Sequence, residues 1–279
     1  MLDKLFIVLV LYKTSLEESK TIRSLCEVLD YPIDLLVYDN SPTRQYQEEY
    51  FQYDKFKVHY RHDKLNLGLS TAYNFALEFA MLANKPWLLL LDQDTTFTRE
   101  YILQLSGLEI EKLSENVVAI IPKVISLEHN QMISPSKMLI GGICRPINVS
   151  AGILDKPISG INSGSILSVS YLKSMEGFDL KYSLDMLDHW YFRKIYRDAK
   201  NVTLLNSTIY QDLSILGDFE ANVSFERYKQ MLTAEMHFIS EDGFLSKFVF
   251  KVRLLVRVIK QMRYKDSRYY KVTIKQIFS

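Results

Sequence analysis

Two carboxylates one residue apart, Asp92 and Asp94, come directly after the apolar run 87–91. Such a run predicts a strand that is buried on both faces, as in a sheet covered by helices. Open α/β sheets bind ligands at the carboxyl ends of their strands, where residues i and i+2 project to the same side. Two carboxylates placed there can hold a hard divalent cation, which in turn can bind a diphosphate. The spacing predicts chemistry on a nucleotide-linked or phosphorylated substrate, although Asp-x-Asp alone is common in solvated turns.

A third carboxylate, Asp39, follows the predicted strand 33–38. Parallel strands end at the same sheet edge, so Asp39 can lie near the acidic pair and accept a hydrogen bond from a nucleotide base. Its alternative role is an Asx turn over 40–42. Asn66 to Gly68 precede a predicted helix, where backbone N–H groups can bind phosphate, but a simple glycine turn fits equally well.

A second pair of carboxylates, Asp185 and Asp188, is spaced i, i+3. If 184–196 is a helix, both side chains lie on one face. A carboxylate beside a sugar hydroxyl can act as a general base. Asp is also favoured at helix N-termini by the helix dipole, and the two interpretations are compatible.

These side chains can form one site only if a sheet brings the ends of their strands together. Apolar runs predict strands at 5–12, 33–38, 56–60, 87–91, 117–121, 161–167 and 202–205. Helical spacing predicts helices at 16–29 (with Ser15 as N-cap), 69–82, 99–113 and 184–196. The alternation favours an α/β fold with a mostly parallel central sheet flanked by helices. The segment 128–155, which contains Gly141-Gly142, is predicted to be a loop or a lid that closes over a ligand.

The composition fits one large domain with an extension, since the chain has 279 residues and is 48% hydrophobic. Its two cysteines, Cys26 and Cys144, have neither metal-ligand spacing nor the pattern of a disulfide framework, which favours a reducing cytosol. The apolar run 5–12 is too short to cross a bilayer and lacks the flanks of a signal peptide.

The charge is distributed unevenly along the chain. From Phe244 onward there are ten Lys or Arg residues and one Asp, a net charge of +9, whereas the rest of the chain carries −8. Residues 244–262 show helical spacing, with an apolar face and a basic face, the latter carrying Lys251, Arg253, Arg257 and Lys260. A basic amphipathic helix is typical of a membrane interface. The alternative is a helix docked on the core with a solvated basic face. Nucleic-acid binding is disfavoured by the acidic body.

Taken in chain order, these motifs resemble those of glycosyltransferase family 2, most closely its bacterial rhamnosyltransferase branch, in which the Asp-Gln-Asp form is typical. The resemblance covers about residues 5 to 212. It is carried by Val37-Tyr38-Asp39-Asn40-Ser41, Asn66-Leu67-Gly68 with Ala72-Tyr73-Asn74, Leu89-Leu90-Leu91-Asp92-Gln93-Asp94, Asn162-Ser163-Gly164-Ser165, Gly177-Phe178-Asp179 and Asp185-Met186-Leu187-Asp188.

The resemblance implies a GT-A (nucleotide-diphospho-sugar transferase) fold, which we assign to residues 1–215. The charge and helical spacing of the remainder predict a helical, basic, membrane-associating extension over 216–279. The resemblance also implies that Asp94 ligates Mg²⁺ or Mn²⁺ and that Asp92 binds the ribose or reaches the metal through water. Asp188 would be the catalytic base, supported by Asp185. The implied donor site comprises Leu11, Tyr12, Asp39, Asn66, Gly68, Asp92 and Gln93, and Lys194 matches a basic position of the family.

The chain departs from the family pattern at two positions. Trp190 stands where the branch often has another acidic residue, two after the base. Gln211 stands where the family often has a His near the metal, so either Gln211 or the adjacent Asp212 is expected to replace it.

The function implied is inverting transfer of a sugar, foremost L-rhamnose from dTDP-L-rhamnose, onto a lipid-linked glycan during capsule or cell-wall polysaccharide synthesis. The enzyme would be cytoplasmic, at the inner face of the cell membrane, and a homodimer is compatible with this reading. The alternatives are a UDP-hexose donor or a degenerate, non-catalytic membrane scaffold. A nucleotidyltransferase is disfavoured because residues 11–15 lack the glycines of a phosphate loop.

Overall fold

The computed structural model describes residues 2–154, 156–212 and 219–278. The predicted domain boundary between 215 and 216 lies outside the described residues. The helices are α1 Lys20–Val28, α2 Leu69–Leu82, α3 Arg99–Ser106, α4 Val169–Ser174, α5 Leu187–Arg197, α6 Phe219–Asn222, α7 Phe225–Ser240, α8 Phe244–Gln261 and α9 Arg268–Ile277. The strands are β1 Leu5–Leu11, β2 Ile33–Asp39, β3 Tyr50–Tyr53, β4 Phe56–His62, β5 Trp87–Asp92, β6 Thr95–Thr96, β7 Val117–Ser126, β8 Gln131–Ser134, β9 Ser136–Leu139, β10 Ile143–Pro146, β11 Gly152–Leu154, β12 Ile166–Ser168 and β13 Asn201–Gln211.

One large sheet organises the fold, with strand order β11-β13-β7-β12-β5-β1-β2-β4-β3. The neighbours β5, β1, β2 and β4 are parallel, as are β7 and β13, whereas β12 runs antiparallel between β5 and β7. In the parallel register Leu11 pairs with Asp39 and Val10 with Asp92. The ends of β2 and β5 therefore meet at one sheet edge on either side of β1, as predicted for parallel strands.

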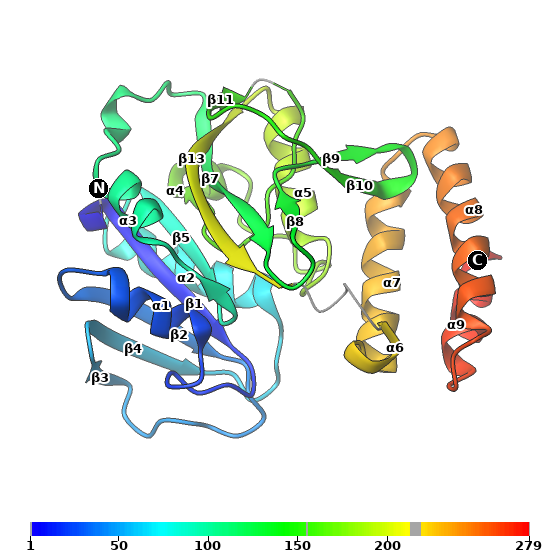
Figure 1. The fold of residues 1–279 in the computed structure, drawn as a ribbon, viewed down its shortest axis with the longest axis horizontal. Helices are drawn as coiled ribbons and strands as arrows, with labels where there is room; N and C mark the ends of the chain where they lie inside the picture. The colour runs from blue at the N-terminus through cyan, green and yellow to red at the C-terminus, as the bar shows by residue number, and fades with distance from the viewer. Residues whose placement is uncertain (1, 155, 213–218, 279) are drawn as a thin grey trace.

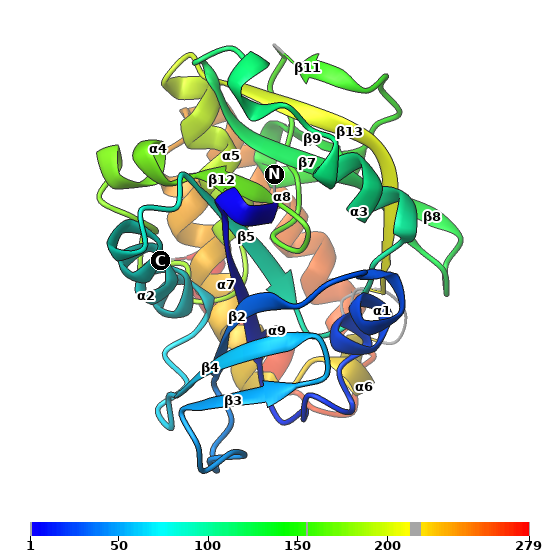
Figure 2. The same cartoon turned by 90° about the vertical axis from the view of Figure 1, so that its left-hand side faces the viewer.

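Helices cover both faces of this sheet. Leu88 and Leu90 of β5 belong to the core formed with α2, α4, α5 and the C-terminal helices, whereas Leu89 and Leu91 belong to the core formed with α1 and α3. Figure 2 shows α2 and α1 on opposite sides of β1 and β5. The continuous apolar run 87–91 follows from this burial on both faces, because alternate side chains of a strand point to opposite sides.

Several predicted elements differ from the structure at their ends. The first helix begins after Ser19, whose side chain accepts from Ile22 N, rather than after Ser15. The predicted helix 99–113 ends at Ser106, and a 3-10 turn, Ile110–Lys112, follows. The segment 161–167 contributes only Ile166 and Leu167 to β12, whereas β13 is far longer than the predicted strand 202–205.

The Gly141-Gly142 segment is not a lid over the strand ends, as was predicted, but the tip of the β9–β10 hairpin docked on α8. Gly141 N donates to Ser246 Oγ at 3.0 Å, and Arg253 donates to the Gly141 carbonyl. A Cβ on Gly141 (φ +72°) would lie 2.5 Å from Val249 Cγ1, so the hairpin backbone packs too closely on α8 for a side chain at this position. Figure 1 shows the hairpin reaching from the sheet to the upper end of α8.

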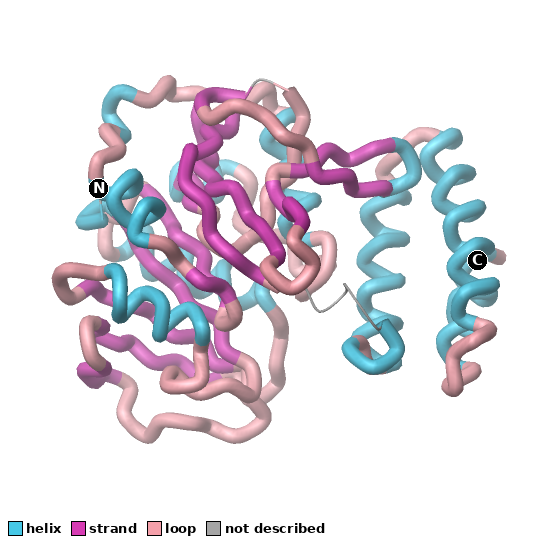
Figure 3. Tube along the Cα trace, viewed as in Figure 1, coloured by secondary structure: helices cyan, strands magenta, loops and turns pink. Residues whose placement is uncertain are grey.

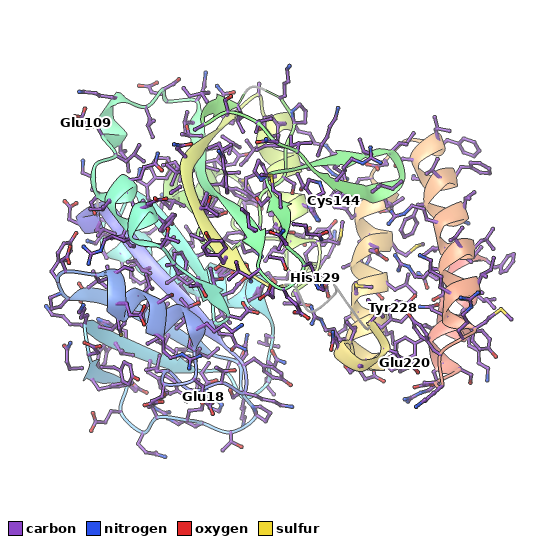
Figure 4. The ribbon with its side chains drawn as sticks, in the orientation of Figure 1. Glu18, Glu109, His129, Cys144, Glu220 and Tyr228 are labelled. Carbon is purple, nitrogen blue, oxygen red and sulfur yellow. The ribbon has the colours of Figure 1, made fainter. Side chains whose placement is uncertain are left out.

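The C-terminal helices form a separate layer beside the sheet (Figures 1 and 3). They are joined by a buried aromatic and polar core: Tyr228 of α7, labelled in Figure 4, is fully buried and its hydroxyl bonds to Thr273 of α9. The helix α8 packs inward through Phe250, Leu254 and Val258.

The opposite side of α8 is apolar and open to solvent. We call it the outer face of α8, and it consists of Leu245, Phe248, Val252, Leu255, Val256, Ile259 and Met262, all exposed. Lys251 and Lys260 are exposed on the same helix. The prediction of a single basic face is wrong for two residues: Arg257 forms a bidentate pair with Glu235 of α7, and Arg253 binds the Gly141 carbonyl.

Within the described residues, no helix is both long enough and apolar enough to pass through a membrane. The two cysteines are free thiols, Cys144 on the exposed side of β10 and Cys26 half-buried on α1.

Candidate active site

The carboxylates of Asp92 and Asp94 converge on one side chain at the end of β13. Gln211 Nε2 donates to Asp92 Oδ2 at 3.1 Å and to Asp94 Oδ1 at 2.9 Å. Gln211 is buried and its Oε1 has no hydrogen-bond partner among the described residues. The geometric prediction that the i and i+2 carboxylates face one site is therefore confirmed.

Hydroxyl groups fix the backbone of the Asp92–Asp94 turn. Thr21 Oγ1 bonds to the carbonyls of Asp92 and Thr95, and Ser19 Oγ donates to the Gln93 carbonyl at 2.8 Å. From the other side, Asp92 N donates to Ser163 Oγ at 3.1 Å. Because α1 and the loop before β12 both hold the turn, its carboxylates are positioned before any ligand arrives.

Burial and nearby negative charges disfavour the ionised forms of Asp92 and Asp94. The pKa of Asp92 lies well above its ordinary value, mainly because the side chain is buried and secondly because Asp94 is negatively charged. The charge of Asp188 adds to this shift, whereas the hydrogen bond from the Gln211 amide opposes it. Burial also raises the pKa of Asp94. A bound cation would relieve this repulsion, since an opposite charge favours the ionised carboxylates.

Asp188, predicted as the catalytic base, is a further carboxylate, and its negative charge adds to the pKa shift of Asp92. It lies in the first turn of α5, half-buried, and its Oδ1 accepts from His189 N at 2.7 Å. Tyr73 of α2 lies beside Asp92, with its hydroxyl 3.4 Å from Asp92 Oδ1. Burial raises the pKa of Tyr73, and the charges of Asp92 and Asp188 add to the shift.

Asp185 lies outside helix α5, which corrects the prediction that Asp185 and Asp188 share a helical face. The helix begins at Leu187, and Met186 before it has a left-handed backbone (φ 69°). Instead, Asp185 Oδ1 lies 3.7 Å from Arg227 Nη2 of α7, and its buried Oδ2 has no hydrogen-bond partner in the described part of the chain. Burial raises the pKa of Asp185, and Arg227 opposes that shift.

The Asn66–Gly68 segment supports the loop that leads to Asp185. Leu69 N donates to the Ser183 carbonyl, and a Cβ on Gly68 (φ +95°) would lie 2.2 Å from the same oxygen. Only glycine fits this contact. Leu67 N donates to Asp63 Oδ2 at 3.1 Å and Asn66 N to the Asp63 carbonyl, so these backbone groups are engaged within the protein rather than open to a phosphate.

Asp39 is fully buried and forms the predicted Asx turn. Its Oδ1 accepts from Ser41 N at 2.9 Å and its Oδ2 from the Tyr60 hydroxyl at 2.5 Å. The side chain of Leu11 is also fully buried in the core, which corrects its assignment to the donor site: only its carbonyl acts near this edge, accepting from Asn40 N.

Gln93 points to the end of β1 rather than to the metal side of the turn. Its Oε1 accepts from Tyr12 N at 2.7 Å and its Nε2 donates to the Tyr12 carbonyl at 3.3 Å. The Tyr12 ring is exposed at 41%, with Lys13 Nζ 5.1 Å from its centre. The glutamine thus fixes the backbone that presents an exposed aromatic ring at the strand edge.

Two further motifs join across the core. Asn74 Nδ2 donates to the Phe178 carbonyl at 2.9 Å, and Phe178 N donates to Asn74 Oδ1 at 2.7 Å. A Cβ on Gly177 (φ +84°) would lie 2.4 Å from that same Oδ1. Asn74 and Gly177-Phe178 therefore attach α2 to the loop before α5, while Tyr73 of the same motif contacts Asp92.

The remaining predicted positions lie away from the acidic centre. Asp212 Oδ1 accepts from Ser126 Oγ at 2.7 Å and from Glu128 N at 3.1 Å, in the β7–β8 turn where Figure 4 labels His129. Gln211, not Asp212, thus faces the acidic pair. Lys194 pairs with Asp198 at 3.7 Å on the exposed side of α5, and the Trp190 ring packs against Tyr182.

The donor atoms fit a hard divalent cation. Two carboxylates converge from one turn, and the buried Gln211 Oε1 has its bonding capacity unused, which in a protein interior costs about 1–3 kcal/mol. Within the described ranges, no group of three His, Cys, Asp or Glu side chains has metal-binding geometry. The fit therefore depends on the amide oxygen as well as the carboxylates.

Sequence reasoning missed Thr21, Tyr73 and Arg227 as parts of this site. Tyr73 and Ser163 lie inside quoted motifs, so their positions carried a signal but their partners did not. Thr21 and Arg227 carry no local signal, because each meets the site only through contacts between distant segments.

Comparison with known proteins assigns the family. The model of "Glycosyl transferase family 2" matches residues 7–155, which include the strand ends at Asp39 and Asp92. The chain belongs to this family of glycosyltransferases. A search of curated protein sequences finds no match.

Solved structures of low sequence identity share the GT-A fold. One is GalNAc-T7 with UDP, GalNAc and Mn²⁺ (TM-score 0.57, 10% identity, 83% of this chain and 48% of that chain). Another is S. aureus TarS (TM-score 0.53, 16% identity, 96% and 54%). A third is the mannosyltransferase PcManGT from Pyrobaculum calidifontis with GDP-Man and Mn²⁺ (TM-score 0.54, 10% identity, 99% and 87%). The chain spans about half the length of the first two.

Proposed function

We propose that the protein is a metal-dependent, inverting glycosyltransferase that moves L-rhamnose from dTDP-L-rhamnose onto a lipid-linked glycan in capsule or cell-wall polysaccharide synthesis. The observation that carries the proposal is the convergence of Asp92 and Asp94 on Gln211 at the end of β5. One acidic pair suits a cation and diphosphate, and a separate carboxylate suits an acceptor hydroxyl.

Asp188 takes the proton from the acceptor hydroxyl as that oxygen attacks the anomeric carbon. Its position in the first turn of α5 is set by the preceding loop, which the Asp185–Arg227 pair and the Gly68–Ser183 contact hold in place. One displacement inverts the anomeric centre. A divalent cation bound by Asp94 and Asp92 would stabilise the charge that develops on the leaving diphosphate.

On the donor side, Gln93 holds the Tyr12 backbone so that the exposed ring can stack on the nucleobase. Asp39 fixes the adjacent turn, and contact between its carboxylate and the base requires access that the buried side chain gains only by local opening. The Asp-Gln-Asp form supports rhamnose, whereas a UDP-hexose is the alternative donor. Thermal unfolding with each sugar nucleotide separates them, because the bound donor raises the apparent stability.

The membrane is the proposed partner of the outer face of α8. Its side chains include Phe248, exposed at 56%, and Ile259, exposed at 63%, beside the exposed Lys251 and Lys260. Apolar side chains flanked by lysines match an anionic lipid surface, into which the helix can lie flat. With this partner, the enzyme would act at the inner face of the cell membrane, beside a lipid-linked acceptor. The competing occupant is a second copy of the chain.

If the protein is not an enzyme, the alternative function is that of a degenerate, non-catalytic membrane scaffold. The direct test of the proposed activity is sugar transfer in the presence of Mg²⁺ or Mn²⁺. A scaffold would show neither transfer nor donor hydrolysis.

A further inference from the structure

The side-chain amide of Gln211 forms hydrogen bonds through its nitrogen but not, within the described residues, through its oxygen. Nε2 donates to both Asp92 and Asp94, while the buried Oε1 has no hydrogen-bond partner among the described residues. The backbone position is fixed, because Gln211 pairs with Thr95 in the β6–β13 ladder, directly after Asp94. Only the outer part of the side chain is therefore left to adjust.

A half-turn of the terminal amide exchanges the nitrogen and oxygen at nearly the same positions, since the two atoms differ little in size. In an octahedral shell with metal–oxygen distances of about 2.1 Å, adjacent ligand oxygens lie about 3.0 Å apart. The amide nitrogen now lies 3.1 Å from Asp92 Oδ2 and 2.9 Å from Asp94 Oδ1. An oxygen in its place would have the spacing of neighbouring ligands without any movement of β13.

We infer that Gln211 is a metal ligand that acts through Oε1 after this half-turn, and that the all-oxygen donor set favours Zn²⁺ less, relative to Mg²⁺ or Mn²⁺, than a site with a His would. The inference deepens the proposed function and rests on its cation site. The amide donates to the two carboxylates; with a cation bound, the same amide would instead turn its carbonyl oxygen to it. Carboxylate and carbonyl oxygens suit Mg²⁺ and Mn²⁺, whereas imidazole suits Zn²⁺.

Asp212, the other residue predicted to replace the His as a metal ligand, is engaged elsewhere. The Asp212 carboxylate is bound by Ser126 and Glu128 N in the β7–β8 turn. No described cluster of three His, Cys, Asp or Glu side chains supplies another ligand set. A purely structural glutamine, by contrast, would act only as a hydrogen-bond donor to the two carboxylates. Gln211→Glu removes that donor but keeps an oxygen, so it should weaken Mn²⁺ binding if the role is structural and preserve it if Gln211 is a ligand.

Direct cation binding separates these roles in the full chain without any turnover. The free Mn²⁺ signal in electron paramagnetic resonance gives the affinity for the metal alone. Gln211→Leu should weaken Mn²⁺ binding by roughly tenfold or more, whereas Gln211→Glu, which keeps an oxygen but cannot donate, should bind Mn²⁺ at least as tightly as the wild type. Gln211→His should increase Zn²⁺ competition against Mn²⁺ by roughly tenfold. Gln104→Leu is the matched control, because that amide also bonds to β13, at Ser207 N, but not to the carboxylates.

The half-turn itself is visible in the side-chain amide resonances of ¹⁵N-glutamine-labelled protein, where the Gln211 signal is the one missing from Gln211→Leu. Saturating Mg²⁺ should shift that signal, because its N–H groups leave the carboxylates. An unshifted signal, or wild-type Mn²⁺ affinity in Gln211→Leu, overturns the inference while leaving the cation site standing. A folded wild-type chain that binds no Mn²⁺, alone or with dTDP or UDP, overturns both the inference and the metal-dependent function.

Discussion

Arg227 of α7 lies 3.7 Å from the Asp185 carboxylate, so the C-terminal helices reach the segment that carries Asp188. Asp185 is 17% exposed at its side chain and Arg227 30%, and the loop between Asp185 and α5 contains the left-handed Met186. The C-terminal helices therefore contribute a cation, Arg227, that balances the buried charge of Asp185, three residues before the proposed base Asp188.

Arg227→Met should leave Asp185 buried without its cation and lower the free energy of unfolding by about 1–2 kcal/mol, less than a fully buried pair because Arg227 is partly exposed. Urea unfolding measures this. Adding Asp185→Asn should restore most of the loss, and Arg268→Met, which breaks the exposed pair with Asp266, should change stability by no more than about 0.5 kcal/mol. Equal losses in Arg227→Met and Arg268→Met would contradict the buried-charge account.

Asp188→Asn should abolish sugar transfer while leaving donor affinity nearly unchanged, because an amide cannot take the acceptor proton but keeps the shape of the side chain. The expected loss in kcat is at least about a hundredfold. Steady-state transfer and calorimetric titration of the donor make the comparison. Turnover at the wild-type rate would remove Asp188 from the role of base.

The metal-free protein should lose stability as the pH rises from acid to neutral. The folded pKa of Asp92 lies above its unfolded value near 4, so the native state binds more protons in this window and its stability falls with increasing pH. In EDTA, Asp92→Asn should therefore gain roughly 1–3 kcal/mol over the wild type between about pH 5 and about pH 8. Urea unfolding at the two pH values tests this, and a variant whose difference from the wild type does not change with pH would count against it.

Binding to anionic liposomes should depend on the outer face of α8. Combining Phe248→Ser, Val252→Ser and Ile259→Ser should weaken co-sedimentation by at least about a hundredfold, since each side chain loses about 1–2 kcal/mol of apolar burial. Added salt should weaken wild-type binding as well. The control combines Leu82→Ser, Leu103→Ser and Leu127→Ser, which are exposed at 78%, 58% and 61% on other elements.

If the wild type failed to bind these liposomes, and the α8 substitutions instead converted a dimer to a monomer in sedimentation velocity, the membrane assignment would be wrong. The outer face of α8 would then be an interface between two copies of the chain.

The sheet and the positions of its acidic ends could be predicted because they depend on local signals. Continuous apolar residues over 87–91 leave few alternatives to a strand buried on both faces, and Asp39 and Asp92 stand where such strands end. Parallel pairing then brings both ends to one edge. The family resemblance rests on the same segments and is confirmed over 7–155.

The parts that could not be predicted depend on contacts between distant segments. The start of α5 is displaced because the loop before it passes against Gly68, which the helical spacing of 184–196 does not encode. The helix α8 has two apolar stripes, and the one that packs inward includes Phe250 and Leu254 because Arg257 on that side meets Glu235. The glycine pair at 141–142 predicts a flexible segment, yet contacts with Val249 and Ser246 of α8 hold Gly141 in place.

The most direct test of the account is transfer from a panel of sugar nucleotides to lipid-linked acceptors, followed by mass spectrometry. With Mg²⁺ or Mn²⁺, the wild type should add one sugar, with the mass of a deoxyhexose when dTDP-L-rhamnose is the donor. EDTA, Asp94→Asn and Asp188→Asn should each abolish the product. A folded wild-type protein that neither transfers nor hydrolyses any sugar nucleotide, with either cation present, would contradict the claim that this site is a glycosyltransferase active site.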